Sequence, residues 1–564
     1  MLPRAPTSAP RSFVVGGRPA LALRLWLPAI INAPPELHGL PAPRVTEIPV
    51  SLSPGAPTDR RSERREYMSS EPRHAIVLVL GDVGRSPRMQ YHALSLARSK
   101  AFTRVFLVGY HGERCVPDVE QNDAISQVLL TADLLPRPTA RALYLAYAPT
   151  KAVLQLFQLL WTLISLPKPE VVLLQTPPAV PTLAAAWLVR FLRGGAVIID
   201  WHNLGFSMLE HTLKRATHPF VRLSRAYESR LSRRLDGHLC VTAAMAAWLQ
   251  AEWGLEARVL HDRPPEFFRR LSAAESHDLF RRLAPQFVDA GGAALWPRED
   301  EKESPWSGGG TPWTTASGEL RPEGRPALLV SSTSWTADED FGLLLDALAA
   351  LDSCLCAEAG RADDCGRLAG PSVVAVITGK GPLKAHYENR MRALPLRRVA
   401  VCTMWLEPAD YPRLLGAADL GVCLHTSTSG LDLPMKVLDM YGCGLPVCAV
   451  GFACLHELLT HGRNGLVFRT KDELASQLHS LLSPTDAAAK KLAQLRAGVA
   501  EVEASRPRWA ENWSVSAGPL LLCEGSHCAR RRPGGMPTLL VLLLTTLGAT
   551  LLSLLIGRYR LRES

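Results

Sequence analysis

The chain has 564 residues, a formal net charge of +10 and a hydrophobic content of 47%. This length allows two buried cores, because single cores stop growing at about 250–300 residues. The positive charge comes with no basic patch interleaved with aromatic residues and no DNA- or RNA-binding motif, so we exclude nucleic acid as a partner. The 12 cysteines form no zinc-like Cys-x-x-Cys pairs, and several stand in apolar runs. We therefore expect a reduced body facing the cytosol rather than a disulfide framework.

The first 72 residues are rich in Pro, Arg and Ser, which predicts a flexible N-terminal segment over 1–72. An apolar patch at 21–31 contains Arg24 and Pro28, and we interpret it as neither a signal peptide nor a membrane span.

Residues 73–270 alternate short apolar runs with helical stretches, which predicts a first Rossmann-like domain. The expected strands lie at 74–80, 105–108, 171–174, 197–200 and 239–242. Within this domain, the apolar stretch 143–166 has two interpretations. We favour a buried helix, and the alternative is a surface helix at a membrane interface.

Beyond residue 270 the pattern dissolves into Gly, Pro, Ser and mixed charge, so we expect an inserted flexible linker over 271–326. Alternation resumes over 327–515 and predicts a second Rossmann-like domain, with strands at 327–331, 373–378, 399–402, 420–424 and 447–449. The fold class is therefore α/β, with two such domains facing a cleft. An uncharged, Leu-rich run at 536–557 predicts a transmembrane anchor, with a buried core helix as the alternative.

The segment 420–446 carries the clearest site. A short strand leads into a hydroxyl- and Gly-rich turn, and a helix opens at about Pro434. The free N–H groups at such a helix start suit a diphosphate, Lys436 supplies a cation, and Asp439 can accept from a ribose hydroxyl. The arrangement predicts a nucleotide-sugar site, although an ordinary strand–loop–helix unit is the alternative. Its candidate residues are Thr426, Ser427, Ser429, Gly430, Asp432, Lys436 and Asp439.

Three further segments, 81–89, 199–203 and 331–336, stand in register with 421–446. Together they resemble the family of chitobiosyldiphosphodolichol β-mannosyltransferases, which are GT-B type glycosyltransferases, over residues 74–515. The resemblance implies inverting transfer of mannose from GDP-mannose, in β-1,4 linkage, to dolichol-diphosphate-linked chitobiose. It also implies a single-pass protein of the endoplasmic reticulum membrane with its catalytic domains in the cytosol, where other mannosyltransferases of the pathway are further partners. The family usually has Glu at the position of Asp439 and an N-terminal anchor, so this chain departs from it twice.

An inverting transfer needs one general base. The resemblance favours Asp82 for this role, with His202 as the competitor and Glu228 as a third candidate. It places further residues on the acceptor side, namely Gly84, Arg85, Ser86 and Asn203. On the donor side, Ser332, Ser334 and Trp335 follow a strand end and can line the donor. Lys380 supplies a second cation for the diphosphate, although a Gly-Lys-Gly run also makes a plain surface turn.

The run 338–340 has the spacing of an acidic metal-binding pair, but a solvated helix start explains it as well. We expect no obligatory metal or cofactor, with a divalent cation at most stimulatory. Two other functions stay open: a GT-B transferase or epimerase using another sugar nucleotide, and a non-catalytic scaffold of the same pathway.

Overall fold

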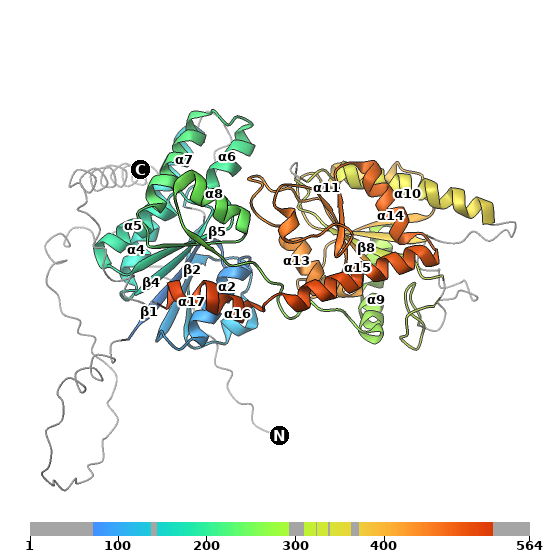
Figure 1. Cartoon of the computed structure of the whole chain (residues 1–564), viewed down its shortest axis with the longest axis horizontal. Coiled ribbons are helices and arrows are strands. Elements are labelled where there is room, and N and C mark those ends of the chain that lie inside the picture. The colour runs from blue at the N-terminus through green and yellow to red at the C-terminus, as the bar shows by residue number, and fades with distance from the viewer. Residues whose placement is uncertain are drawn as a thin grey trace, which may run out of the picture. The chain divides into compact units, whose positions relative to one another are not determined.

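A computed structural model describes residues 72–132, 134–136, 144–292, 309–322, 324–336, 339–362 and 371–522 (Figure 1). The predicted membrane run 536–557 and nearly all of the N-terminal segment 1–72 lie outside these residues. Contacts divide the chain into two units between residues 133 and 134.

The strands between residues 73 and 270 fall in both units. The first unit contains the order β3-β2-β1, and the second contains the order β4-β5-β6-β7. The pairings β1–β2, β2–β3, β4–β5, β5–β6 and β6–β7 are all parallel. The strands are β1 (His74–Asp82), β2 (Arg104–Tyr110), β3 (Ile125–Leu130), β4 (Val171–Thr176), β5 (Ala196–Trp201), β6 (Gly237–Cys240) and β7 (Ala257–Val259). The helices are α2 (Pro87–Arg98), α3 (Pro117–Glu120), α4 (Tyr144–Ser165), α5 (Thr182–Arg193), α6 (Gly205–Leu213), α7 (Pro219–Ser232) and α8 (Ala243–Trp253).

The second Rossmann-like domain has a six-stranded parallel sheet in the order β10-β9-β8-β11-β12-β13. Its order reverses between β8 and β11, which is where α/β sheets bind ligands. The strands are β8 (Ala327–Ser332), β9 (Val373–Thr378), β10 (Val399–Met404), β11 (Leu420–Cys423), β12 (Val447–Val450) and β13 (Gly465–Phe468). The helical segments are α9 (Ala273–Phe287), η2 (Val288–Gly292), α10 (Phe341–Ala362), α11 (Lys384–Arg392), α12 (Asp410–Ala417), α13 (Met435–Gly442), η4 (Leu455–Glu457), α14 (Lys471–Leu482), α15 (Asp486–Ser505), α16 (Trp509–Ser516) and α17 (Gly518–Leu521).

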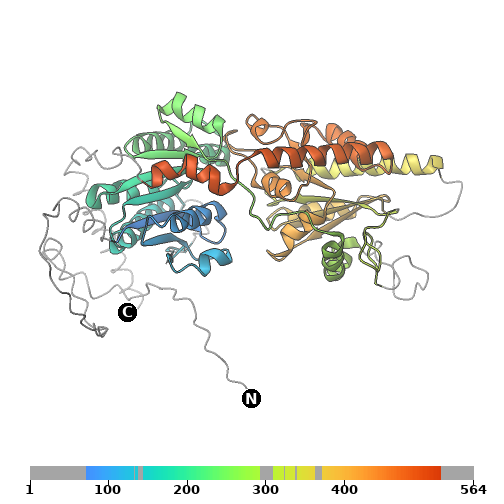
Figure 2. The ribbon, with the colours of Figure 1, turned by 60° about the horizontal axis from the view of Figure 1, so that its bottom comes forward.

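Two apolar clusters cover the two faces of this second sheet. Neighbouring residues of β8 point to opposite faces, with Leu329 in one cluster and Leu328 and Val330 in the other. The first face packs against α10, α11 and α14, and the other against α9, α12 and α13. Figures 1 and 2 both show α10, α14 and α15 lying side by side. Strands buried on both sides in this way read as continuous apolar runs, which is why sequence patterning located them.

The segment 271–326 departs from the expected flexible linker. Helix α9 begins with a capping box, in which Ser272 accepts from the Glu275 backbone and Glu275 accepts from the Ser272 backbone. Its apolar residues Leu279, Phe280, Leu283 and Phe287 are buried, and Phe280 stacks on buried Trp313 with ring centroids 4.3 Å apart. The linker prediction is therefore wrong for 273–287, whose apolar residues recur at helical spacing, and for the segment around Trp313, which packs against that helix.

The apolar stretch 143–166 forms α4, which has one buried and one exposed face. Leu159 and Leu163 are fully buried, whereas Phe157, Trp161 and Ile164 are 41%, 69% and 45% exposed. The buried-helix interpretation thus holds for one face only. Neither α4 nor any other helix in the described part of the chain combines the length and apolarity needed to cross a bilayer.

The last described helices contact the first Rossmann-like domain. Asn512 on α16 donates to the backbone oxygen of His261, at 3.4 Å. On α17, the side chain of Leu520 lies 3.4 Å from the position that a Cβ on Gly237 of β6 would occupy.

Candidate functional site

The hydroxyl-rich turn after β11 is organised by one carboxylate. Ser427 Oγ and Ser429 Oγ both donate to Asp432 Oδ1, the latter at 3.3 Å. Asn203 Nδ2, from the first Rossmann-like domain, donates to the same oxygen at 2.9 Å. Gly430 has φ = 73°, a conformation that suits glycine. The turn leads through Pro434, at the N-cap position, into α13, so the strand–turn–helix arrangement expected around this site is present.

Lys436, in the first turn of α13, forms an ion pair with Glu339. The Glu339 side chain is 1% exposed, and it also accepts from Thr333 Oγ1 and the Ser334 backbone N–H, both at 2.7 Å. Burial raises the pKa of Glu339, but the Lys436 charge and these hydrogen bonds outweigh it, so that the pKa falls below its ordinary value. The interpretation of this acidic run as a solvated helix start is therefore wrong for Glu339, which joins the β8 loop to α13.

Trp335 does not line the site, contrary to expectation. Its side chain is 1% exposed and packs on Phe341, with ring centroids 4.7 Å apart. Its indole N–H donates to the Gly379 backbone oxygen at 3.2 Å, which holds the following turn at the end of β9. The aromatic ring is therefore part of the core, and its role is to position that turn.

The turn containing Lys380 fits closely against the β8 loop. A Cβ on Gly379 or Gly381 would lie 1.8 Å from the backbone oxygen of Thr333 or Ser334, respectively, so only glycine fits. Lys380 Nζ lies 3.8 Å from the ring centroid of exposed Trp405, a cation–π distance. On the β8 side, Ser332 Oγ donates to the Tyr411 hydroxyl at 2.9 Å, while Ser334 Oγ donates to Glu339 Oε2 at 3.1 Å.

Asp439 lies one turn beyond Lys436 on α13. Its carboxyl is partly buried, and burial together with the charge of Asp262 raises its pKa to about 7. A carboxyl of this kind can accept from a ribose hydroxyl when it is ionised.

In the first unit, Asp82 ends β1 and organises the turn that follows. Its Oδ1 accepts from the Gly84 backbone N–H at 2.9 Å, and its Oδ2 accepts from the Glu113 backbone N–H at 3.1 Å. Ser86 Oγ donates to the Asp82 backbone oxygen at 2.9 Å, and Arg85 pairs with the Glu113 carboxylate at 2.9 Å. The Asp82 carboxylate thus holds two backbone segments together.

His202 is held by a buried carboxylate at the end of β5. Its Nε2 lies 2.9 Å from Oδ2 of Asp200, whose side chain is fully buried, while the His202 side chain is 23% exposed. The two side chains share one side of the strand because they are two residues apart. The next residue, Asn203, donates to Asp432 as described and also to Thr428 Oγ1 at 3.3 Å. His202 therefore stands next to a residue that contacts the hydroxyl-rich turn.

Glu228, the third candidate base, is completely buried on α7. It accepts from the Gly205 backbone N–H at 3.1 Å and from Ser224 Oγ at 3.0 Å. Burial raises its pKa to about 7 despite these hydrogen bonds. Its carboxylate lies beside Gly205, the first residue of α6. Glu228 therefore has a structural role, because it satisfies an N–H group at the start of that helix.

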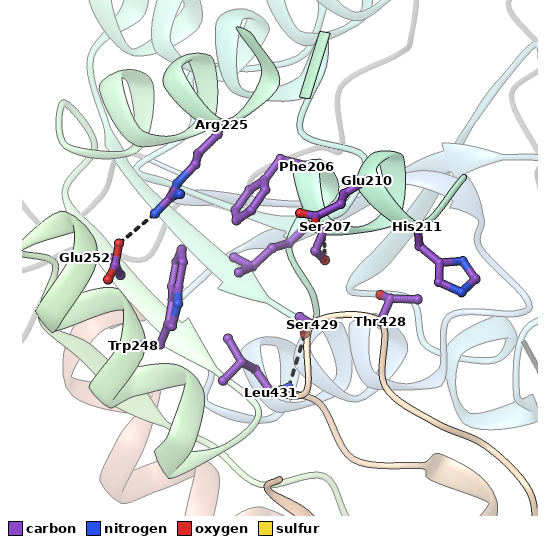
Figure 3. Close-up of a pocket in the computed structure, with 11 residues that line it drawn as sticks. Phe206, Ser207, Glu210, His211, Arg225, Trp248, Glu252, Thr428, Ser429 and Leu431 are labelled. Carbon is purple, nitrogen blue, oxygen red and sulfur yellow. Dashed lines mark hydrogen bonds and ion pairs between the residues drawn. The ribbon is translucent and has the colours of Figure 1, made fainter. Parts of the chain in front are cut away.

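A pocket of about 550 Å³ lies between α6, α7, α8 and the hydroxyl-rich turn (Figure 3). Its lining includes residues that sequence reasoning missed, above all Trp248 on α8. The lining comprises Leu204, Phe206, Ser207, Glu210, His211, Arg225, Trp248, Glu252, Thr428, Ser429 and Leu431. The described residues contain no cluster of three or more His, Cys, Asp or Glu side chains suited to a metal ion.

Two parallel-sheet domains with a loop–helix site at the topological switch point define the class of GT-B glycosyltransferases. Residues 84–264 match the family model described as a glycosyl transferase 4-like domain, and residues 355–484 match that of glycosyl transferases group 1. The chitobiosyldiphosphodolichol β-mannosyltransferase of Mus musculus is 44% identical over 476 residues, which cover 84% of this chain and 94% of the relative. The chain therefore belongs to the family of chitobiosyldiphosphodolichol β-mannosyltransferases.

Other similar proteins carry different names or show the fold alone. The Arabidopsis thaliana protein named UDP-glycosyltransferase TURAN is 43% identical, over 79% of this chain and 97% of its own. The structure of Anabaena HepE with UDP-glucose has a TM-score of 0.51 at 16% identity, covering 79% of this chain and 99% of that one. Sucrose-phosphate synthase from Thermosynechococcus elongatus has a TM-score of 0.54 at 13% identity, covering 80% of this chain and 100% of that one.

Proposed function

We propose that this chain transfers mannose from GDP-mannose to dolichol-diphosphate-linked chitobiose, forming a β-1,4 linkage with inversion. The observation that carries the proposal is its similarity to relatives named for this reaction, 44% in Mus musculus and 43% in Homo sapiens, over at least 80% of this chain. Both domains contribute, because the two matching family models fall on different halves of the chain.

The reaction breaks the bond between mannose C1 and the β-phosphate oxygen and forms a bond from C1 to the acceptor O4. The electron pair of the broken bond stays on the diphosphate, and the acceptor hydroxyl gives its proton to a base. Lys436 and Lys380 are the cations near the β11 and β9 ends, and fixed charge of this kind stabilises a departing diphosphate. In this scheme, donor binding either releases Lys436 from Glu339 or leaves Lys436 in contact with both Glu339 and the diphosphate.

For the general base we now favour His202 over Asp82. Asp200 holds one ring nitrogen of His202 and stabilises the imidazolium that forms on proton uptake, as the carboxylate does in other catalytic pairs. Both Asp82 oxygens already accept backbone N–H groups, which suits a positioning role. Asn203, expected on the acceptor side, links the base to the donor turn through Asp432.

The test is a donor screen with lipid-linked chitobiose as acceptor. We expect turnover with GDP-mannose and none with UDP-glucose or UDP-N-acetylglucosamine. The Arabidopsis relative, named a UDP-glycosyltransferase at 43% identity, favours a uridine donor as the second candidate. Preferential turnover of a UDP-sugar would replace our donor assignment with that candidate, and no turnover of any donor would favour the scaffold function.

We also propose that the enzyme works at the endoplasmic reticulum membrane with its catalytic domains facing the cytosol, beside other mannosyltransferases of the pathway. The uncharged run at 536–557 supports a single-pass anchor, since about 20 apolar residues span a bilayer. A dolichol-linked acceptor stays in the membrane, so the enzyme has to meet it there. We propose that no metal is obligatory and that a divalent cation at most stimulates the reaction.

A further inference from the structure

An aromatic wall forms one side of the pocket beside α6, α7 and α8. The Phe206 and Trp248 rings stack with centroids 5.9 Å apart and an interplanar angle of 29°, and Trp253 packs edge-on against Trp248 at 5.0 Å. Phe206 and Trp253 are buried, whereas Trp248 is partly exposed and lines the pocket. The partly exposed Trp248 ring thus lines the pocket beside the Phe206 ring (Figure 3).

Polar groups surround this wall. Ser207, Glu210 and His211 come from α6, and the Thr428 and Ser429 side chains come from the hydroxyl-rich turn (Figure 3). Arg225 lies over both Phe206 and Trp248, at 5.4 and 5.9 Å from their centroids, but its charge is matched by Glu252 at 2.6 Å. Glu210 lines the pocket and is not part of that ion pair. The pocket therefore carries no surplus positive charge that would attract a polyphosphate. An aromatic face with many hydroxyl and carboxyl groups suits a saccharide, whose ring has an apolar C–H face and an edge of hydroxyl groups.

The pocket adjoins the segment that carries the proposed base. Ser207 Oγ lies 3.4 Å from Asn203 Oδ1, and Asn203 follows His202 directly in the chain. The same Asn203 contacts Thr428, which lines the pocket. The pocket is thus lined by the helix that directly follows the His202 segment and by residues of the hydroxyl-rich turn on the donor side.

We propose that this pocket binds the N-acetylglucosamine residues of the acceptor, with Trp248 as the stacking platform and Glu210 and His211 as hydrogen-bonding partners of the sugar. The inference rests on the proposed function for the identity of the acceptor. A volume of about 550 Å³ accommodates a disaccharide and is in the range of small-molecule sites.

The test compares Trp248→Ala and Trp248→Phe with Trp161→Ala, a matched control on α4 whose indole is 69% exposed and outside the pocket. With full-length enzyme and a short-chain lipid-diphosphate chitobiose, we expect Trp248→Ala to raise the acceptor KM about tenfold or more, as loss of a well-placed aromatic contact does. The KM for GDP-mannose should stay at the wild-type value in these variants. The melting temperature of Trp161→Ala should also stay at the wild-type value. Trp248→Phe keeps an aromatic face and should recover most of the affinity.

A direct binding measurement covers the case in which Trp248→Ala fails to fold. In wild-type enzyme labelled with fluorotryptophan, free chitobiose should shift the Trp248 resonance, identified by its loss in Trp248→Phe, and leave that of Trp161 in place. An unchanged acceptor KM in folded Trp248→Ala, a rise in donor KM alone, or an unshifted Trp248 resonance would overturn the pocket assignment. Such a result leaves the proposed function standing as long as the wild type transfers mannose, whereas a wild type without transfer contradicts the function itself.

Discussion

At the residue scale, the two candidate bases differ in what their surroundings leave them free to do. The His202 ring is held through one nitrogen by buried Asp200, which leaves the other nitrogen to accept a proton. The Asp82 carboxylate is engaged at both oxygens by backbone N–H groups. Sequence position favoured Asp82, and hydrogen bonding now favours His202.

We expect His202→Ala to lower kcat by about 10²- to 10⁴-fold, the usual contribution of a general base. Asp82→Asn should keep kcat near wild type and lower stability, because the amide replaces one acceptor oxygen by a donor, at about 1–3 kcal/mol for an unsatisfied group. Steady-state kinetics with saturating donor and thermal melts measure both effects. If Asp82→Asn abolishes turnover in a folded protein while His202→Ala retains it, the two roles are reversed.

The Lys436–Glu339 pair allows binding and stability to be separated. Lys436→Ala leaves Glu339 charged and buried without its partner, which costs about 3–5 kcal/mol when such a pair is broken from one side. The double variant Lys436→Ala/Glu339→Gln should recover most of the melting temperature but not the donor affinity. Loss of one charge-assisted contact, about 1.5–3 kcal/mol, corresponds to a Kd for GDP-mannose raised roughly 10- to 150-fold. Calorimetric titration of the double variant decides, and a wild-type Kd would remove Lys436 from the donor site.

At the element scale, helix starts carry much of the site's organisation. Glu457, from η4, accepts from the backbone N–H groups of Ala243 and Ala244 at the start of α8, both at 2.7 Å. Thr242 caps the same helix and donates to the Leu431 backbone oxygen at 2.5 Å. Buried Glu228 likewise accepts from the Gly205 backbone N–H at the start of α6. The helices that line the pocket are thus fixed by carboxylates and hydroxyls from other elements.

Glu228 should make stability depend on pH. Burial raises its pKa from about 4.5, the ordinary value expected in the unfolded chain, to about 7 in the folded protein. Between these two pH values the folded state therefore binds a proton that the unfolded state has lost. Stability then falls as pH rises from about 4.5 to about 7 and changes little above that. Glu228→Gln keeps an acceptor for the Gly205 N–H but cannot ionise, so it should be more stable than wild type at pH 8 and similar at pH 5. Urea unfolding at the two pH values measures this, and a stability difference that does not grow with pH would contradict it.

At the scale of the whole molecule, the repeating units could be predicted and the long-range contacts could not. Buried parallel strands read as apolar runs, so most strands and the strand–turn–helix site were located from sequence. The partners of Asn203 and Lys436 lie 229 and 97 residues away in the chain, and no local pattern encodes such pairs. Trp335 was assigned to the donor site because it follows a strand end, yet its contacts with Phe341 place it in the core. Helix α9 did carry a local signal, the capping box at Ser272, which was missed amid Gly- and Pro-rich neighbours.

The state of the cysteines is informative about the compartment in which the catalytic domains lie. All nine cysteines that the structure describes are free, and seven of them are buried. Burial raises the pKa of Cys402 and Cys448 to about 12, which keeps these thiols protonated and unreactive. Such thiols are compatible with the reducing compartment that we propose for the catalytic domains.

Membrane orientation gives the last prediction. Asn512-Trp513-Ser514 is an N-glycosylation sequon within α16, where Asn512 donates to the His261 backbone and Trp513 is buried. A body in the cytosol never meets the glycosylation machinery, so Asn512 should stay unmodified and protease should digest the second domain in sealed microsomes without detergent. A lumenal protein in the same microsomes serves as the control for sealing. The opposite orientation exposes Asn512 before α16 folds. Protection from protease together with a glycosidase-sensitive mass shift would therefore contradict the cytosolic arrangement and, because a nucleotide-sugar donor from the cytosol could not then reach the site, the donor assignment as well.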